Sequence, residues 1–409
     1  MAIIKVRNPA IDLDAAEIPN LDANKITTGT IDNARISLDA NEIPSLDTAK
    51  ITTGTFDDAR MPSTVLNSNV SVPNQSAFKN IIINGDMSIA QRGTSSSITT
   101  SGYYTVDRFN MPINTMGTFT VSQSTDTPTG QGFSTSSKYD CTTADASPAS
   151  GDFIRFEQYV EAQNLQYLKF GTANAQSLTL SFWVKSTKTG TYIAELRNFD
   201  GGRTICNSYT INASNTWEKK TITVSGDTSG SFNNDNGLGL ACIFWLGAGS
   251  DFTSGTLATD WEATTSANRA VGQVNLADST SNEWYITGVQ LEAGTTASDF
   301  EFLPYDVNLQ RCQRYYELCD GNRVVGTSYN SKLFCNQIRF SVTKRASPTI
   351  TIQNNTTVFT VFHSGGYDTS QTWNTDEQDI DYFNINMTNT RATGFIGPGD
   401  DLFIANSEI

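Results

Sequence analysis

The chain has 409 residues, with 42 Asp and Glu against 27 Lys and Arg, which gives a formal net charge of −15. A surface this acidic repels phosphate backbones and anionic lipids, which argues against binding to nucleic acid or to a membrane surface. Charged residues make up only 17% of the chain, less than is usual for globular domains, and Ser, Thr, Asn and Gly take their place. This composition favours exposed strands and turns over helices, whose surfaces are rich in Glu, Lys and Ala.

The sequence shows neither a transmembrane segment nor a secretory signal. No apolar run approaches the ~20 residues that span a bilayer, and the start, MAIIKVRNPAIDLD, does not read as a secretory signal. We therefore expect no membrane insertion and folding in a cytoplasm. The cysteines form no CxxC pair, so reduced thiols are expected rather than disulfides or zinc sites. These cysteines are Cys141, Cys206, Cys242, Cys312, Cys319 and Cys335.

The first part of the chain contains a unit that is repeated after 25 positions, KITTGTIDNARI from Lys25 and KITTGTFDDARM from Lys50. Within each copy apolar residues recur five positions apart, which matches neither a helix nor a strand. So sparse a stripe cannot form a core within one chain, whereas three copies wound together can bury it. We interpret residues 1–65 as a thin trimeric shaft; a disordered linker is the alternative. Its predicted contacts are Leu21, Ile26, Ile31, Ile36, Leu46, Ile51, Phe56 and Met61.

From residue 76 to residue 310 the pattern changes to short alternating segments separated by turn-rich stretches. In SLTLSFWVKS (177–186) one face is apolar, and the opposite face carries Trp183 and Lys185. Four further segments are predicted strands, at 191–198, 219–226, 239–247 and 283–294. Many short strands without alternating helices predict an antiparallel sandwich.

Motifs across this body and beyond it resemble a module that is common in bacteriophage tail fibres. The module runs through Asn-Gly-Asp, Gln-Arg-Gly, Asp-Arg-aromatic, Gln-Leu-Glu and Cys-Gln-Arg-Tyr-Tyr, which stand here at 84–86, 91–93, 107–109, 290–292 and 312–316. The ITTGT repeats resemble the shafts of such fibres, and RASPTITI and the closing LFIANSEI resemble their ends. The resemblance implies a mainly β protein with an extended trimeric shaft, a jelly-roll body akin to carbohydrate-binding modules, a short helix and a small C-terminal β domain. The corresponding divisions are 1–75, 76–310 and 311–409.

Five charged residues of these motifs are predicted to hold the structure together rather than to act on a ligand. Asp107 and Arg108 are adjacent, so they need different partners, and we expect Arg108 to pair with Glu292 or Asp86 where the first and last strands meet. A structural Ca²⁺ held by such carboxylates is the alternative, and no other metal or cofactor is expected. The predicted structural residues are Asp86, Arg92, Asp107, Arg108 and Glu292.

The last hundred residues are predicted to begin with a helix over 307–319, because Leu309, Cys312, Tyr316 and Cys319 fall on one face. Predicted strands follow at 332–342, 349–353 and 357–363, and together they suggest a small distal β domain.

Two predicted loops of this distal domain, 364–384 and 394–401, are rich in aromatic, Asn and Asp residues. Flat aromatic faces stack on sugar rings and Asp or Asn side chains bind hydroxyl groups, so this composition suits glycan recognition. The alternative is that Trp373 and Tyr382 pack a trimer interface. The candidate receptor-binding residues are Trp373, Tyr367, His363, Asp376 and Asp379.

Catalysis is not indicated by any motif. His363 is the single histidine of the chain, and VFHSGG around it contains no nucleophile elbow. We therefore predict a homotrimeric tail fibre of the virion that is not an enzyme. Its N-terminus would attach to a phage tail or baseplate protein, and its distal domains would bind a host surface glycan or an outer-membrane protein. The alternatives are a glycan depolymerase with paired carboxylates and a stand-alone carbohydrate-binding module.

Overall fold

The computed structural model describes residues 78–320, 324–329, 332–335, 337–352, 358–363, 366–388, 393–397 and 402–409. The chain divides into two units, Met1–Asn74 and Gln75–Ile409. The predicted shaft contacts, from Leu21 to Met61, lie outside the described residues, so the fold concerns the second unit. Among the helices that are described, none has the length and apolar character needed to cross a membrane.

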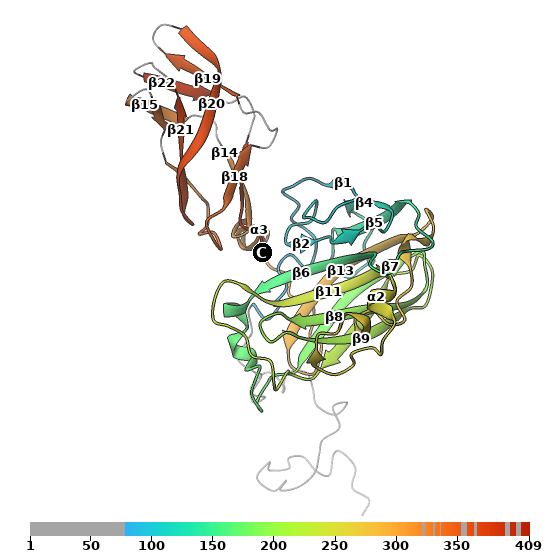
Figure 1. Ribbon diagram of the computed structural model, residues 1–409. Helices are drawn as coiled ribbons and strands as arrows, with labels where there is room; N and C mark the ends of the chain where they lie inside the picture. Colours follow the sequence, from blue (N-terminus) through green and yellow to red (C-terminus); the bar gives the residue numbers. More distant parts are fainter. Residues whose placement is uncertain are drawn as a thin grey trace, which may run out of the picture. The chain divides into compact units, whose positions relative to one another are not determined.

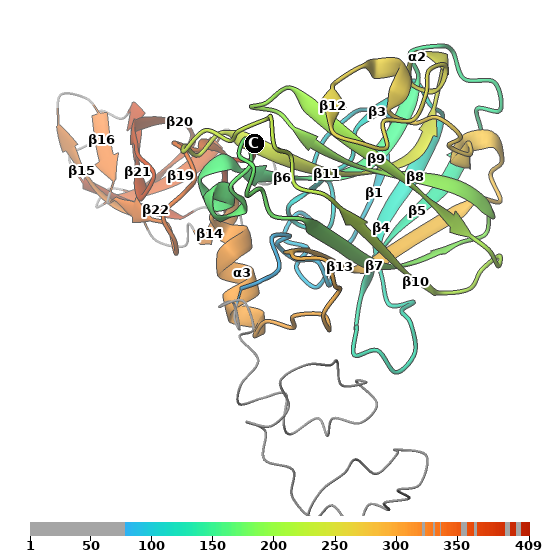
Figure 2. The ribbon, with the colours of Figure 1, turned by 90° about the horizontal axis from the view of Figure 1, so that it is seen from below.

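The body of this unit is a sandwich of two antiparallel sheets, with strands of both layers visible in Figures 1 and 2. The first sheet has the strand order β1-β4-β5-β13-β7-β10, and the second has the order β12-β9-β8-β11-β6-β2, with β3 paired to β6. The first sheet consists of β1 (Ser95–Ile98), β4 (Thr118–Ser124), β5 (Ser136–Thr143), β13 (Glu283–Ala293), β7 (Leu178–Ser186) and β10 (Glu218–Val224). The second consists of β12 (Glu262–Ala263), β9 (Arg203–Ile211), β8 (Gly190–Asn198), β11 (Leu238–Ala248), β6 (Phe153–Glu161), β2 (Phe109–Asn110) and β3 (Ile113–Asn114).

Eight strands of the body follow the order of a jelly roll. Strands β5-β13-β7-β10 form one layer and β6-β11-β8-β9 the other, so that most successive strands change layer, as in a double Greek key. The predicted antiparallel sandwich is confirmed, and the strands predicted in the body agree with β7, β8, β10, β11 and β13 to within two residues at each end.

Alternation along the strands places the core between the two layers. The apolar face predicted for β7 is buried there, whereas Trp183 lies half-buried on the opposite face. Large rings fill the centre, where Phe156 stacks on Phe109 at a centroid distance of 4.4 Å and meets the edge of Trp284 at 5.8 Å. Such aromatic contacts add to the stabilisation from burial alone. The predicted inward residues of β7 are Leu178, Leu180, Phe182 and Val184.

The outer face of the second sheet is covered by the chain between β11 and β13. This cover contains the short helices α2 (Ser250–Thr253), η7 (Ser266–Asn268) and η8 (Leu276–Asp278). It buries a second apolar cluster around Trp245, whose Nε1 donates to Glu195 at 2.9 Å. Glu195 also forms an ion pair with Arg269 at 2.8 Å, so its buried charge is compensated. The second sheet thus has no open face over this cluster.

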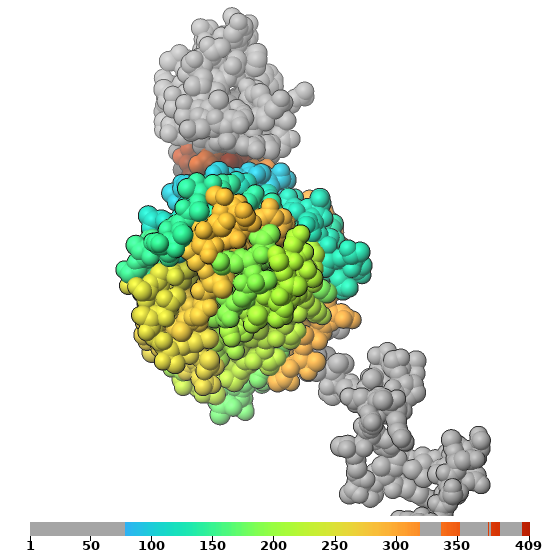
Figure 3. Space-filling view, turned by 90° about the vertical axis from the view of Figure 1, so that its right-hand side faces the viewer, coloured from blue at the N-terminus to red at the C-terminus, as the bar shows by residue number. Residues whose placement is uncertain are grey.

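Figure 3 shows one surface of the body, with the green residues of β7 to β10 near its centre.

The predicted helix over 307–319 is too long. The helix α3 spans Tyr305–Gln313, and Tyr316 and Cys319 lie in the strand β14 (Tyr316–Asp320). β14 pairs with β23 (Leu402–Asn406), which pairs in turn with β18 (Thr349–Ile352). Because β23 comes from the end of the chain, the helical spacing of the local sequence could not reveal this pairing. The division predicted between residues 310 and 311 falls within α3, beside a short 3-10 helix, η6 (Ala162–Leu168), of the body.

The remaining strands form a seven-stranded sheet in the order β16-β15-β22-β19-β20-β21-β17. The segments 364–384 and 394–401, predicted as loops, instead contribute much of β20, β21 and β22 to it. Thr, Tyr and Trp in these segments favour strands, and pairing with β19 and β15 satisfies their backbones. Its strands are β15 (Val324–Tyr329), β16 (Lys332–Cys335), β17 (Ile338–Arg339), β19 (Val358–His363), β20 (Gly366–Gln378), β21 (Tyr382–Thr388) and β22 (Thr393–Gly397).

The partner predicted for Arg108 is wrong. Arg108 forms its ion pair with Glu408, next to the last residue of the chain, and not with Glu292 or Asp86. Glu292 instead accepts hydrogen bonds from Ser298, and Asp86 from Asn308. The sequence predicted that an ion pair of Arg108 closes the fold, but the chain end, far away in sequence, supplies the acid.

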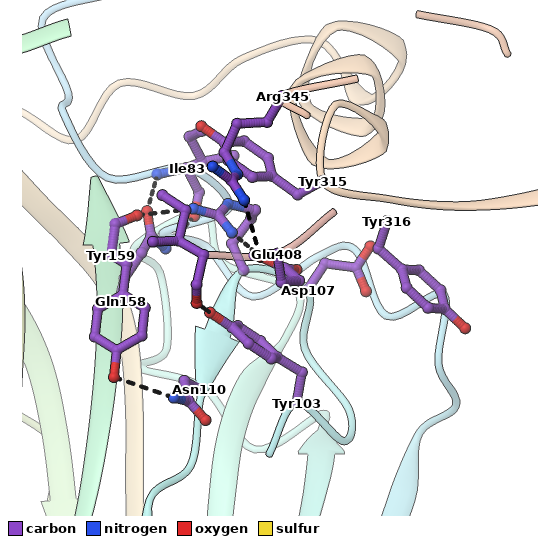
Figure 4. Close-up of polar contacts among 12 residues, drawn as sticks. Ile83, Tyr103, Asp107, Asn110, Gln158, Tyr159, Tyr315, Tyr316, Arg345 and Glu408 are labelled. Carbon is purple, nitrogen blue, oxygen red and sulfur yellow. Dashed lines mark hydrogen bonds and ion pairs between the residues drawn. The ribbon is translucent and has the colours of Figure 1, made fainter. Parts of the chain in front are cut away.

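Figure 4 shows how the chain end is held, with Glu408 close to Tyr103, Asp107 and Tyr315. Arg92 also pairs with Glu408 at 3.1 Å, and its other terminal nitrogen lies 3.6 Å from Asp107. Tyr103 donates from its hydroxyl to the carbonyl oxygen of the last residue at 3.3 Å. The predicted structural role of Arg92, Asp107 and Arg108 thus has a physical basis in this buried network.

Candidate functional site

The outer face of the first sheet carries a cavity of about 290 Å³. Its floor is formed by neighbouring strands, since Trp183 of β7 lies opposite Lys219 of β10 and Thr287 of β13. Because side chains of a strand alternate between faces, the burial of Leu178, Leu180, Phe182 and Val184 in the core turns Trp183 outward. Lys219 is exposed, so the floor combines an indole with a free ammonium group.

One wall of this cavity is a cluster of three phenylalanines from two loops. Phe133 belongs to the loop between β4 and β5, which extends away from the sheet in Figure 2, and Phe300 and Phe302 follow β13. Their ring centroids lie 4.9 to 5.1 Å apart. Phe302 remains 50% exposed, so an apolar surface faces the cavity. Gln131 and Asp299 supply polar groups beside these rings.

A bulge in β13 lets the phenylalanine cluster approach the sheet. The register between β13 and β7 shifts between Thr287 and Gln290, and Gly288 within this bulge has a φ of +63°. A Cβ atom at Gly288 would lie 2.5 Å from Cζ of Phe133. Glycine therefore serves both the positive φ and the close packing of the ring.

A second polar and aromatic group lies on the same sheet face, around Lys185. Its ammonium forms an ion pair with Asp126 and lies 4.2 Å from the ring centroid of Tyr285. Trp217 donates from Nε1 to Asp126 at 2.9 Å. Burial by itself would raise the pKa of Asp126, but the hydrogen bonds from Lys185 and Trp217 hold it below its usual value. Asp126 is thus an exposed, ionised acceptor fixed in place by two partners.

Chemically, this face combines apolar rings with hydrogen-bonding groups. Aromatic rings offer flat surfaces to the apolar face of a sugar, and the neighbouring Lys, Asp and Gln side chains bind hydroxyl groups. The residues that the structure describes contain no group of three or more His, Cys, Asp or Glu placed to hold a metal ion. The structural Ca²⁺ considered as an alternative stays a prediction.

The receptor-binding residues predicted from the sequence lie in the seven-stranded sheet. His363 ends β19, and Tyr367, Trp373 and Asp376 stand in β20, but the side chains of these four residues lie outside the described part of the chain. Asp379 follows β20 and is exposed, and its Oδ1 accepts from the backbone of Ile380 at 2.6 Å. Their role in receptor binding therefore stays a prediction.

Sequence reasoning identified Trp183 and Lys185 as outward-facing but did not make them site candidates. The alternation in DFEFLP, which places Phe300 and Phe302 on one side, was a usable signal. Phe133, Trp217 and Asp126 had no local signal, because they reach the sheet from separate loops.

The chain shows only limited similarity to known proteins. No protein-family model and no curated protein sequence matches the chain. Among solved structures, the enzymatically active domain of tailspike protein 4 of bacteriophage CBA120 is 15% identical with a TM-score of 0.28, over 53% of this chain and 21% of that one. The chain therefore matches only about a fifth of that tailspike domain.

Two carbohydrate-binding modules are matched over nearly their whole length. The module TmCBM61, in complex with β-1,4-galactotriose, is 10% identical with a TM-score of 0.26, over 52% of this chain and 98% of that one. A family 11 module from Clostridium thermocellum, in complex with a β-1,3-1,4-mixed-linked tetrasaccharide, is 11% identical with a TM-score of 0.23, over 52% and 95%. These scores are too low to support a statement about this chain, whose jelly-roll fold is established by its own strand order.

Proposed function

We propose that the protein is a receptor-binding tail fibre of a bacteriophage, and that the outer face of its first sheet binds a glycan of the host surface. The observation that carries the proposal is the cavity formed by Trp183, Lys219 and the Phe133–Phe300–Phe302 cluster on the outer face of the first sheet. Rings and polar groups lie side by side there, as sugar recognition requires.

The fibre architecture is supported by the repeat of the N-terminal segment and by the motif resemblance of the body. The shaft would bring three chains together and attach them to a tail or baseplate protein. Three weak sites per fibre, and several fibres per virion, would then act together through their high effective concentration. An outer-membrane protein is the alternative receptor, with the seven-stranded sheet as its contact.

The test is binding of the full-length protein to an array of bacterial lipopolysaccharide and capsule oligosaccharides. Trp183→Ala should lower the apparent affinity for the bound glycan about tenfold, because one stacking surface is lost. Tyr305→Ala is the matched control, since Tyr305 is 65% exposed and lines neither this cavity nor any other described one.

If Trp183→Ala binds the glycan as well as the unchanged protein does, the sheet face is not the binding site. Absence of any bound glycan, together with release of reducing sugar from host polysaccharide, would favour the depolymerase alternative instead.

A further inference from the structure

A second and larger cavity, of about 520 Å³, shares no lining residue with the cavity on the sheet face. It lies where the start of the described chain, the end of β6, η6 and α3 meet. Figure 2 shows α3 in orange beside the blue start of the described chain and the green turns of η6. We call it the α3 groove.

The α3 groove contains an arginine, Arg311, that forms no ion pair within the described part of the chain. Arg311 forms none of the ion pairs found among the described residues, and its one hydrogen bond is a long one of 3.5 Å to the carbonyl oxygen of Asn80. Arg314, which directly follows α3, is bound by both carboxylate oxygens of Glu161, each at 2.8 Å. The carboxylate of Glu301, which is near Arg311, is instead occupied by the backbone amides of Phe78 and Asn80 at 2.5 and 2.9 Å.

This isolation has an energetic cost that a ligand would offset. Arg311 is half-buried, and this burial lowers the pKa of its guanidinium, although the nearby charge of Glu301 opposes the shift. A partly desolvated cation that no described acid contacts directly is only partly compensated, and a planar guanidinium is suited to bind a carboxylate through two parallel hydrogen bonds. Glu161, at the end of β6, does not line the groove; it is fully buried and is already bound by Arg314, Tyr315 and Gln163.

The other walls of the α3 groove have the chemistry of a sugar site. Phe78 is 58% and Tyr167 36% exposed, and both line the groove. Asn164 is exposed and makes no side-chain hydrogen bond within the described part of the chain. An aromatic face and a free amide match the apolar and hydroxyl-bearing sides of a sugar ring, and Arg311 adds selectivity for an acid group.

We propose that the α3 groove binds a carboxylate-bearing sugar, with Arg311 holding the carboxylate and Tyr167 or Phe78 packing on the ring. The choice of a saccharide as ligand class rests on the proposed glycan-binding function, whereas the choice of an acidic unit rests on Arg311 itself.

The test uses the full-length protein and four small probes in ligand-observed NMR titrations. Methyl glucuronide and the methyl glycoside of N-acetylneuraminic acid carry a carboxylate; methyl glucoside and methyl galactoside are neutral. We expect at least one acidic probe to bind, and Arg311→Gln to weaken it about tenfold or more, because a charge-assisted hydrogen bond is lost. Arg311→Lys should restore part of this affinity.

Arg339→Gln is the matched control, because it removes an exposed cation from β17 without touching the α3 groove. Trp183→Ala should leave binding of the acidic probe intact. The proposal for the α3 groove is therefore tested separately from the proposal for the sheet-face cavity. The proposal is overturned if neither acidic probe binds better than the neutral ones, or if Arg311→Gln binds as well as the unchanged protein. It is also overturned if Arg311→Gln alters the oligomeric mass but not sugar binding, since the groove would then be a contact between chains.

Discussion

Asp107 is buried in the network at the chain end, and from this burial we predict how the stability of the protein depends on pH. Burial raises the pKa of Asp107 from 3.8 to about 6, although the charge of Arg92 and hydrogen bonds from Gln91 oppose this shift. Between these two pH values the folded protein keeps a proton on Asp107 that the unfolded chain has released. This residue's contribution to stability is therefore fully present below about pH 4 and is lost as the pH rises through 6.

The corresponding variant is Asp107→Asn, which cannot titrate. The free energy of unfolding of the unchanged protein should fall by roughly 2 kcal/mol more between pH 4 and pH 7 than that of the variant, since one pKa unit corresponds to about 1.4 kcal/mol. Urea unfolding at several pH values measures both profiles. Parallel profiles would show that Asp107 ionises in the folded protein as it does in the unfolded chain.

Glu408 supplies the charge that compensates Arg108, whose side chain is 1% exposed. Glu408→Gln removes this charge and leaves the buried guanidinium with neutral partners, which include the carbonyl of Tyr159 and the ring of Tyr315. We expect a loss of about 3 kcal/mol in the free energy of unfolding, as is usual when one member of a buried pair is removed. Asp260→Asn, at an exposed acid, should change it by less than about 0.5 kcal/mol. Equal effects of the two variants would contradict the assigned role of Glu408.

At the scale of elements, the bulge of β13 links the fold to the sheet-face cavity. Gly288→Ala would meet both a positive φ and the ring of Phe133, whereas Gly130, with a φ of +77°, has no atom within 4 Å of an added Cβ. Gly130→Ala should therefore cost about 1 kcal/mol for the backbone alone. Gly288→Ala should cost 1 to 3 kcal/mol more, since the packed ring has to move (roughly the cost of overpacking).

Glycan binding distinguishes these two glycine variants as well. Displacing Phe133 disturbs one wall of the cavity, so Gly288→Ala should weaken binding while Gly130→Ala should not. Urea unfolding and the oligosaccharide array provide the two measurements. If both variants lose the same stability and keep the same affinity, the bulge does not position the phenylalanine cluster.

The whole molecule is predicted to be a trimer held by its N-terminal repeats. Light scattering of the full-length protein should give about three times the chain mass of 44.5 kDa. The double variant Ile26→Asp, Ile51→Asp places charges in the predicted apolar stripe and should reduce the mass to that of one chain. Thr27→Asp, Thr52→Asp adds the same charges one position away and should remain trimeric. A single-chain mass for the unchanged protein would refute the shaft.

Much of the architecture could be predicted from the sequence, because it depends on short-range patterns. Alternation of apolar residues determines which face of β7 enters the core, and turn-rich stretches determine where the strands end, so the antiparallel sandwich followed directly. The predicted helix over 307–319 was wrong because the structure of this segment depends on long-range contacts. The pairing of Tyr316 to Asp320 with β23 involves residues more than eighty positions away.

The sequence by itself determined the sandwich and the outward direction of Trp183, because both follow from the periodicity of apolar residues. Only the tertiary structure decided that Glu408 neutralises Arg108, that Phe133 joins Phe300 and Phe302 over the sheet, and that Arg311 forms no ion pair with any acid in the described segments. These contacts join residues from distant parts of the chain. Their geometry is set by the packing of the whole unit, which no single stretch of sequence encodes.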